Sequence, residues 1–189
     1  TKINVINHRV TCSNLTDKKL NYQYGYAINH ENITTKRVIE GGQKRTYFSF
    51  FSSIDYTFKK VDLRGAFRYL YSDKNQNAFT PALNLKFNFP DMDIRFSYAN
   101  GFRIPSLKEM HFNFIDINHN IQGNSNLKSE YSKNFQLTFD SKFLNPHKLN
   151  LNFFYNQIDD FITLIQNQNS ITFDYLNIGS YETIGAKLG

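Results

Sequence analysis

The segment "VDLRGAFRYLY", residues 61–71, alternates between two kinds of side chain. Its odd positions are apolar or aromatic apart from one glycine: Val61, Leu63, Gly65, Phe67, Tyr69 and Tyr71. Its charged side chains all fall at even positions: Asp62, Arg64 and Arg68. Successive side chains of a β-strand point to opposite faces, so the segment predicts a strand with one apolar and one polar face.

The same alternation recurs along most of the chain. Residues 79–89 repeat it in full, and shorter versions occur at 20–26, 48–58, 94–98, 135–139 and 149–155. No stretch shows helical periodicity of comparable strength. The sequence therefore predicts an all-β chain with about nine strands, at 3–11, 19–29, 47–58, 61–72, 79–89, 93–100, 130–142, 148–164 and 171–189.

The composition excludes several classes of protein. The chain has 19 Phe, 12 Tyr and no Trp, with a mean hydropathy of -0.52. No run approaches the ~18 consecutive apolar residues of a membrane-spanning helix. The net charge is +6, but basic residues occur in separate pairs such as Lys36-Arg37 and Lys59-Lys60, so we expect no nucleic-acid partner. The single Cys12 excludes an internal disulfide and a cysteine-rich metal site.

Alternating strands suit either a soluble sandwich, with the apolar face inward, or an outer-membrane barrel, with the apolar face toward lipid. The predicted segments run to about 10 residues, which suits a tilted strand crossing a bilayer and exceeds the ~5–6 typical of soluble strands. Predicted tight turns at 59–60, 90–93 and 145–147 alternate with longer loops at 30–45, 73–78 and 100–130. Short turns at one end and long loops at the other are typical of outer-membrane barrels.

Tyrosines lie on the apolar face near the long-loop ends of several strands: Tyr24, Tyr26, Tyr69, Tyr71, Tyr98 and Tyr155. A phenol ring with one wet end suits the membrane–water boundary. We therefore interpret the fold as an antiparallel transmembrane β-barrel, with a solvated face on a soluble sheet as the alternative.

Charged residues on the polar faces then become candidates for the lumen: Asp62, Arg64, Arg68, Lys86 and Arg95. An ionised group facing lipid would cost about 2–4 kcal/mol at the bilayer midplane. So many long side chains also need a wide lumen rather than a narrow eight-stranded barrel.

About nine strands is an odd number, whereas bacterial single-chain barrels have even numbers and closed edges. The alternating pattern also runs up to Ala186-Lys187-Leu188-Gly189 at the end of the sequence. We therefore expect residues 1–189 to be part of a larger barrel.

Four segments carry a family resemblance: "ANGFRIPSLKEMHF" at 99–112, "GNSNLKSEYSKNFQL" at 123–137, "FYNQIDDFITL" at 154–164 and "YLNIGSYETIGAKL" at 175–188. In this order they resemble the second half of TonB-dependent outer-membrane receptors. The positions that match the family motif are Gly101, Phe102, Arg103, Pro105, Ser106, Leu107, Glu109, Gly123, Asn124, Leu127 and Glu130. Ser125 and Ser129 depart from it, because they stand where the family often has proline.

The resemblance implies a 22-stranded barrel, of which this chain would supply about nine strands, with a plug domain and final strands outside residues 1–189. It implies a receptor in the outer membrane for TonB-coupled import of a scarce, bulky nutrient: a metal chelate such as a siderophore, cobalamin or haem. Expected partners are outer-membrane lipid, the TonB complex acting through the plug, and the nutrient, with a surface lipoprotein left open. A passive porin-like channel is the alternative function.

Residues 100–130 are then an extracellular loop, where recognition residues are presented by a rigid scaffold. The ligand-binding candidates combine charge with aromatic rings: Arg103, Glu109, His111, Phe112, Phe114, Asp116 and His119. Two alternatives stay open for Arg103 and Glu109, which could pair within the loop or against the lumen wall. Pro105, Leu107, Gly123 and Asn124 are interpreted as loop architecture.

We expect neither a metal site nor a cofactor. His111 and His119 are eight residues apart across a loop, which is no metal-ligand spacing. The sequence has no Gly-x-Ser-x-Gly motif and no Ser-His-Asp set supported by spacing, so we do not expect an enzyme.

Overall fold

The computed structural model of the chain describes residues 2–14, 19–38, 41–72, 77–116, 120–141, 148–167 and 172–189. Its strands are β1 (Lys2–Asn14), β2 (Leu20–Thr34), β3 (Gly42–Phe58), β4 (Val61–Ser72), β5 (Ala78–Asn88), β6 (Met92–Arg103), β7 (Phe114–Ile115), β8 (Asn120–Gln122), β9 (Glu130–Ser141), β10 (Leu149–Gln166) and β11 (Phe173–Leu188). One α-helix, α1 (Leu107–His111), occurs among the described residues. None of the helical structure in these ranges has the length and apolar character to cross a membrane.

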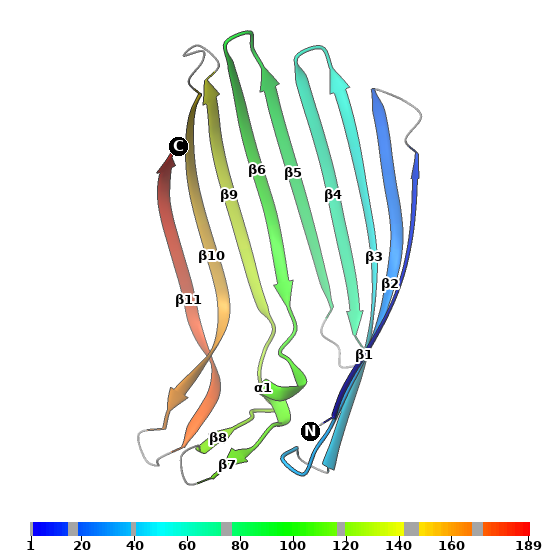
Figure 1. The fold of residues 1–189 in the computed structure, drawn as a ribbon, viewed down its shortest axis with the longest axis vertical. Coiled ribbons are helices and arrows are strands. Elements are labelled where there is room, and N and C mark those ends of the chain that lie inside the picture. The colour runs from blue at the N-terminus through cyan, green and yellow to red at the C-terminus, as the bar shows by residue number, and fades with distance from the viewer. Residues whose placement is uncertain are drawn as a thin grey trace.

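All eleven strands belong to one sheet, in the order β1-β2-β3-β4-β5-β6-β9-β10-β11-β8-β7. The long strands run antiparallel to their neighbours, and β8 joins the far side of β11 as a short parallel pair. The sheet forms a tall curved wall that does not close, with β1 and β11 at its two sides (Figure 1). The predicted antiparallel all-β fold is confirmed.

Each of the nine long strands overlaps one of the nine predicted segments, but the predicted loop at 30–45 is wrong. β2 continues to Thr34 and β3 begins at Gly42, so their connection is residues 35–41. The last residues of this hairpin, around His30-Glu31-Asn32, carry polar side chains on both faces and show no alternation. Beyond a bilayer a strand has no lipid face to cover, so the period-two signal ends before the strand does.

Other predicted boundaries also shift. β6 begins at Met92 and extends to Arg103, which shortens both the predicted turn at 90–93 and the predicted loop at 100–130. The predicted turn at 145–147 and residues 73–76 of a predicted loop lie outside the described residues. The helix α1 is not anticipated by periodicity because it has only five residues.

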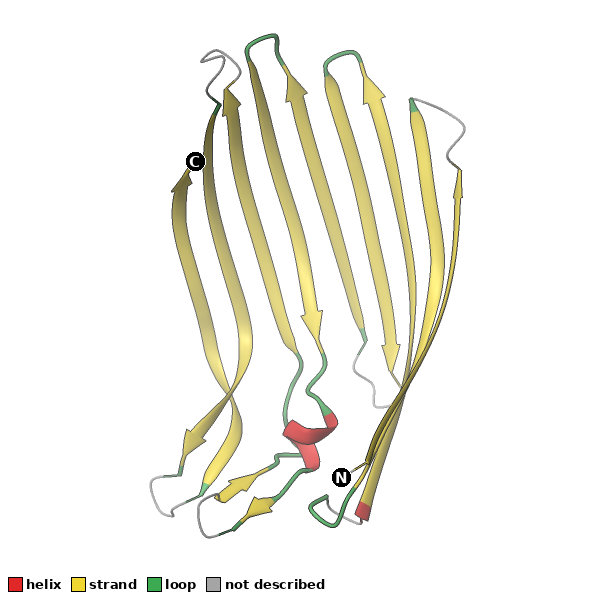
Figure 2. Cartoon of the chain, viewed as in Figure 1, coloured by secondary structure: helices red, strands yellow, loops and turns green. Residues whose placement is uncertain are grey.

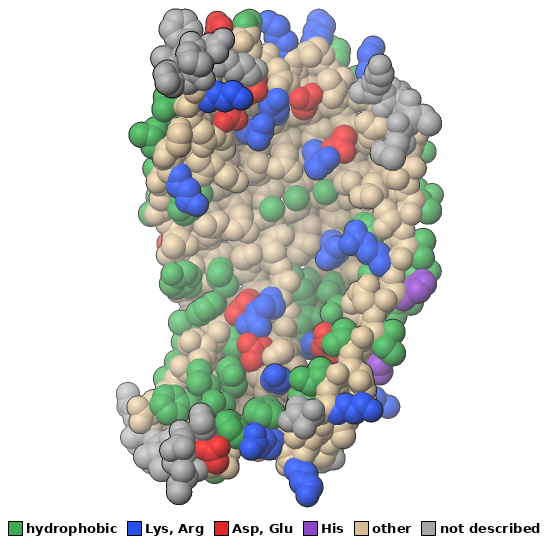
Figure 3. Space-filling view, viewed as in Figure 1, with side chains coloured by type: hydrophobic (Ala, Val, Ile, Leu, Met, Phe, Trp, Pro, Cys, Tyr) green, Lys and Arg blue, Asp and Glu red, His purple; other side chains and the backbone are tan. Residues whose placement is uncertain are grey.

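The strand register separates the apolar and polar side chains onto two faces. Leu63 pairs with Leu85, Leu85 with Phe96, and Phe96 with Leu137, which makes an apolar row across four strands. The next row contains Asp62, Lys86, Arg95 and Thr138 in the same way. The polar row lies on the concave face, where Figure 3 shows basic and acidic side chains scattered over the wall, with apolar side chains along both edges and over the lower part.

The apolar face has no second layer packed on it. Phe67 is 37% exposed and Phe153 43% exposed, and Leu85 and Phe96 are half-exposed. The two buried apolar clusters instead lie around the connections at one end: Ile33, Val38 and Leu107 in one, and Met110, Leu127 and Ile162 in the other. A soluble sandwich would bury the apolar face between sheets, so the structure favours a barrel wall whose convex face meets lipid.

The two faces generate a direct prediction for β6. In the intact receptor that contains this chain, Phe96→Arg should lower the free energy of unfolding by roughly 2–4 kcal/mol, because it places a charge in lipid. Ser97→Arg is the matched control on the adjacent lumen-facing position and should cost under about 1 kcal/mol, since water solvates the new charge. Urea unfolding of the two variants in bilayers measures both values. A larger loss for Ser97→Arg would contradict the assignment of the faces.

Candidate functional site

The candidate site lies at the end of the wall that carries α1, β7 and β8, at the bottom of Figures 1 and 2. These three elements belong to the connection between β6 and β9, residues 104–129, which we call the braced loop. One buried cluster joins Leu107 of the loop to Ile33 and Val38 at the tip of the β2–β3 hairpin. The other joins Met110 and Leu127 of the loop to Ile162 of β10. The braced loop therefore packs between two hairpins at the mouth of the wall.

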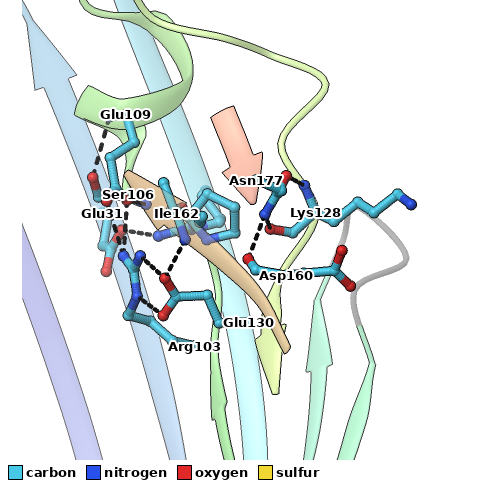
Figure 4. Close-up of polar contacts among 11 residues, drawn as sticks. Glu31, Arg103, Ser106, Glu109, Lys128, Glu130, Asp160, Ile162 and Asn177 are labelled. Atoms are coloured by element: carbon cyan, nitrogen blue, oxygen red, sulfur yellow. Dashed lines mark hydrogen bonds and ion pairs between the residues drawn. The ribbon is translucent and has the colours of Figure 1, made fainter. Parts of the chain in front are cut away.

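Arg103, the last residue of β6, is the centre of an ionic hub (Figure 4). Its Nε and Nη2 donate to the two carboxylate oxygens of Glu130 at 2.6 and 2.7 Å. Its Nη1 lies 3.0 and 2.9 Å from the two oxygens of Glu109 in α1. A planar guanidinium has the donors for such paired contacts with carboxylates, which lysine lacks. Arg103 thus links the wall and the loop.

Both carboxylates of the hub have further partners. Glu130 Oε1 accepts a hydrogen bond from the backbone N–H of Ile162 on β10 at 2.7 Å. Glu109 Oε2 accepts from the backbone N–H of Ser106 at 2.6 Å, and the Ser106 hydroxyl accepts from the Glu109 N–H at 3.2 Å. This reciprocal capping box starts α1 at the residue after Ser106. The hub therefore fixes the helix start relative to three strands.

A second polar link joins the loop to the β2–β3 hairpin. Arg45 is buried, and its Nη1 donates to the backbone oxygen of Pro105 at 2.6 Å. Its Nη2 lies 2.6 Å from Glu31 Oε2, and the Tyr47 hydroxyl donates to Glu31 Oε1 at 3.2 Å. Burying Arg45 is tolerable because a carboxylate and a carbonyl meet its guanidinium.

The second family segment, which begins at Gly123 and Asn124, holds the C-terminal part of the braced loop. At Gly123 a Cβ atom would come within 2.8 Å of the backbone nitrogens of His111 and Phe112, so only glycine allows this approach. The Asn124 N–H donates to the Glu109 backbone oxygen at 2.9 Å, and its side-chain Nδ2 donates to the Tyr175 oxygen at 3.0 Å.

Asn177 of β11 holds the backbone of Lys128 through hydrogen bonds. Its Oδ1 accepts from the Lys128 N–H at 2.8 Å, and its Nδ2 donates to the Lys128 oxygen at 3.0 Å and the Asp160 oxygen at 2.6 Å (Figure 4). The motif residues of both segments therefore have architectural contacts.

The predicted ligand-binding candidates fall into different environments. Arg103 and Glu109 are held in the hub. Pairing within the loop and pairing against the wall were both left open, and both occur, because Arg103 pairs with Glu109 of the loop and with Glu130 of the wall. His111 is buried at 7% exposure, and Phe112 packs against the cluster of Ile33, Val38 and Leu107. The Phe114 ring lies 4.1 Å from the Arg37 guanidinium carbon, and Asp116 is exposed. His119 lies outside the described residues.

Sequence reasoning missed three groups that organise the site. These are Arg45 with Glu31, Arg37 against Phe114, and Asn177 beside Lys128. Glu31, Arg37 and Arg45 carried a signal as charged residues in the predicted loop at 30–45, and Asn177 as part of the family segment at 175–188. The sequence did not indicate which residues they contact.

The predicted lumen candidates share the concave face, and four of the five have polar partners there. Lys86 lies 3.4 Å from Asp93, Arg95 lies 3.9 Å from Asp140, and Arg64 pairs with Asp55. Asp62 accepts a hydrogen bond from Asn88 at 2.8 Å. Arg68 differs, because its guanidinium lies 5.6 Å from the Phe51 ring centre. Among the described residues no carboxylate forms an ion pair with it.

Within the ranges that the structure describes, no group of three or more His, Cys, Asp or Glu side chains could hold a metal ion. Cys12 is an exposed free thiol.

Comparison with known proteins gives matches at two levels. A family model described as "TonB dependent receptor-like, beta-barrel" matches residues 7–188. Among curated proteins, the hemoglobin and hemoglobin-haptoglobin-binding protein B of Haemophilus influenzae is 35% identical over 86 residues, 44% of this chain and 8% of that protein. The corresponding protein C is 36% identical over 73 residues, 39% of this chain and 7% of that protein. The chain thus matches a small part of these relatives.

Solved structures show the same fold at low identity. The siderophore receptor PirA from Pseudomonas aeruginosa superposes with a TM-score of 0.81 at 16% identity, covering 98% of this chain and 37% of that chain. The Serratia marcescens hemophore receptor HasR, in complex with its hemophore HasA and heme, gives 0.78 at 14% identity, covering 98% and 38%.

The hub predicts how the loop responds to one substitution. In the intact receptor, Arg103→Gln removes the ion pairs to Glu109 and Glu130, and amide hydrogen exchange across residues 104–129 should become about tenfold faster. A tenfold change corresponds to the low end of the free energy that hydrogen bonds to charged groups contribute, and the low end applies because Arg103 is 44% exposed. Arg95→Gln is the control, since its pair with Asp140 is longer and lies away from the loop. Unchanged exchange in Arg103→Gln would contradict the hub.

Proposed function

This chain belongs to the TonB-dependent receptor family, in its β-barrel domain, and we propose that it forms part of the wall of an outer-membrane receptor for active nutrient import. The observation that carries the proposal is the continuous antiparallel wall with a polar concave face and a braced loop at its mouth. A wall of this kind encloses a lumen, and the loop presents side chains to a ligand that enters it.

The rest of the receptor is also a proposal. We propose that further strands pair with β1 and β11 to complete a 22-stranded barrel, because open strand edges in lipid leave backbone groups unpaired. We propose that a plug domain outside this chain fills the lumen and couples it to the TonB complex. The partial coverage of relatives, 37% of the PirA chain and 8% of the Haemophilus protein, supports a longer receptor.

Within the expected nutrient classes, the haem class has the strongest support. The two relatives at 35% and 36% identity are named for hemoglobin binding. The fold-level neighbours include both siderophore and hemophore receptors, so fold alone does not separate the metal-chelate, cobalamin and haem classes. We propose haem iron drawn from a protein carrier as the nutrient.

The proposed recognition surface is the outer part of the braced loop. Residues 113–121 include Phe114 with Arg37 above its ring, the exposed Asp116, and His119. The hub and the capping box lie at the strand ends, where the braced loop begins, and hold this segment in place. We therefore assign Arg103 and Glu109 to positioning, and Phe114, Asp116 and His119 to ligand contact.

A passive anion channel is the second candidate, since basic side chains line the concave face. The contacts weigh against it, because Arg64, Lys86 and Arg95 are each paired with a carboxylate of the same wall. We propose a binding and transport role without catalysis.

The test replaces residues 113–121 and keeps the residues of the hub and of the capping box. Gly123 lies against the backbone of His111 and Phe112, so a short Gly-Ser linker joins Phe112 to Gln122 in place of residues 113–121. In a strain lacking other haem receptors, this variant should lose growth on hemoglobin as the iron source, at unchanged amounts of folded receptor. Replacing the opposite-end turn Lys59-Lys60 with Asn-Gly is the control and should grow normally.

Full growth of the linker variant would contradict the assignment of residues 113–121 to recognition. Absence of hemoglobin-dependent growth in the unmodified strain would contradict the haem class itself.

A further inference from the structure

Phe51 places a large aromatic ring on the polar concave face. It is paired with Arg68 on β4 and with Gly25 on β2, and it is buried at 8% exposure. A Cβ atom on Gly25 would lie 2.7 Å from the ring and 2.2 Å from the Val10 backbone oxygen. The absence of a side chain at Gly25 therefore lets the Phe51 ring lie down on the wall, and the ring is fixed there.

Two arginines converge on this ring. The Arg9 guanidinium carbon lies 4.6 Å from the Phe51 ring centre, and that of Arg68 lies 5.6 Å from it. Both distances are within the range of cation–π attraction, so the ring holds both side chains near one place. Because the two distances are measured to the same ring centre, the two guanidinium carbons are at most about 10 Å apart. Both arginines are exposed on the concave face.

Five other basic residues around the lumen and its mouth are paired with carboxylates, whereas these two arginines have no such pair among the described residues. Arg45, Arg64, Lys86, Arg95 and Arg103 each have a carboxylate within 4.0 Å. No described residue places a carboxylate within that distance of Arg9 or Arg68. Figure 3 shows a group of basic side chains over β2–β4 without acidic side chains beside it. Two like charges held at one ring repel each other, and an anion between them would relieve that repulsion.

A hollow of about 450 Å³ lies beside Phe51 and Arg68. Its lining includes Phe51 and Arg68, together with the small side chains of Ala66, Ala78 and Ala82, which leave the wall recessed. The volume is within the ~300–1,000 Å³ range of small-molecule sites. The lining also reaches Gly101 and Phe102, next to Arg103 of the hub. The hollow therefore extends toward the end of the wall that carries the braced loop.

We propose that Arg9, Phe51 and Arg68 form an anion-binding site on the lumen wall that takes the carboxylates of the transported ligand. The inference rests on the proposed haem class, since haem carries two propionate carboxylates on one edge of a flat ring. Arginine binds carboxylates through paired N–H donors, and the recessed aromatic platform limits the water that competes for them.

The experiment compares two porphyrins that differ at the propionates, which are ionised in one and uncharged methyl esters in the other. Haem and haem dimethyl ester are titrated into the purified full-length receptor in detergent and followed by their absorbance. The wild-type receptor should bind haem at least about tenfold more tightly than the ester. The double variant Arg9→Gln/Arg68→Gln should lose this preference while its affinity for the ester stays unchanged. Arg64→Gln is the control, because Asp55 already neutralises that charge, and it should keep the preference.

Each other outcome overturns the site. If the double variant keeps the preference for haem, the two arginines do not bind the carboxylates, and the haem class survives. If it loses both porphyrins equally, or its folded yield falls, the arginines hold the wall or a lumen-filling segment of the receptor. If the wild-type receptor binds neither porphyrin, the haem class is wrong and the propionate assignment fails with it.

Discussion

A strand that crosses hydrocarbon must place every backbone polar group in a hydrogen bond to a neighbouring strand, because lipid offers none. The long strands β2 to β6, β9 and β10 have an antiparallel neighbour on both sides, with one interruption at Asp160 of β10, and the arrangement of the side chains follows from this pairing. Leu85 and Phe96 share the convex face, while their neighbours Asn84 and Ser97 share the concave one. Every polar contact discussed above depends on this separation, since the ion pairs and the hollow all lie on the side that water can reach.

The end of the wall is organised by ionic contacts rather than by lipid. Arg103 pairs with Glu130 of the wall and with Glu109 of the loop. The 26 residues between Arg103 and Glu130 therefore begin and end at fixed places. Arg45, Gly123 and Asn177 each fasten a different part of the same loop. The family motif residues thus hold the loop in place, and the outer part of the loop is the segment that we propose contacts a ligand.

Sequence reasoning found the wall and the motif residues that hold the loop, but not their partners on other strands, for a physical reason. Alternation is imposed by lipid on one side and water on the other, so it is strong at Val61–Tyr71 and fades where β2 and β3 extend past the bilayer. The partners at the mouth lie far apart in the chain, as with Arg45 and Pro105, and periodicity carries no information about them. Ser106 and Glu109 were singled out as positions of the family motif but not as a capping box, and the five-residue helix that they begin is too short to show a period of its own.

The orientation of the two faces is the central claim, and a spin-label scan of β6 tests it most directly. Cysteine replaces each residue from 93 to 98 in turn in a receptor whose Cys12 is serine, and each is labelled in lipid bilayers. The account predicts that collisions with oxygen, which concentrates in lipid, peak at 94, 96 and 98, and that collisions with a water-soluble nickel chelate peak at 93, 95 and 97. The opposite phase, or labels at 94, 96 and 98 that neither reagent reaches, would contradict it.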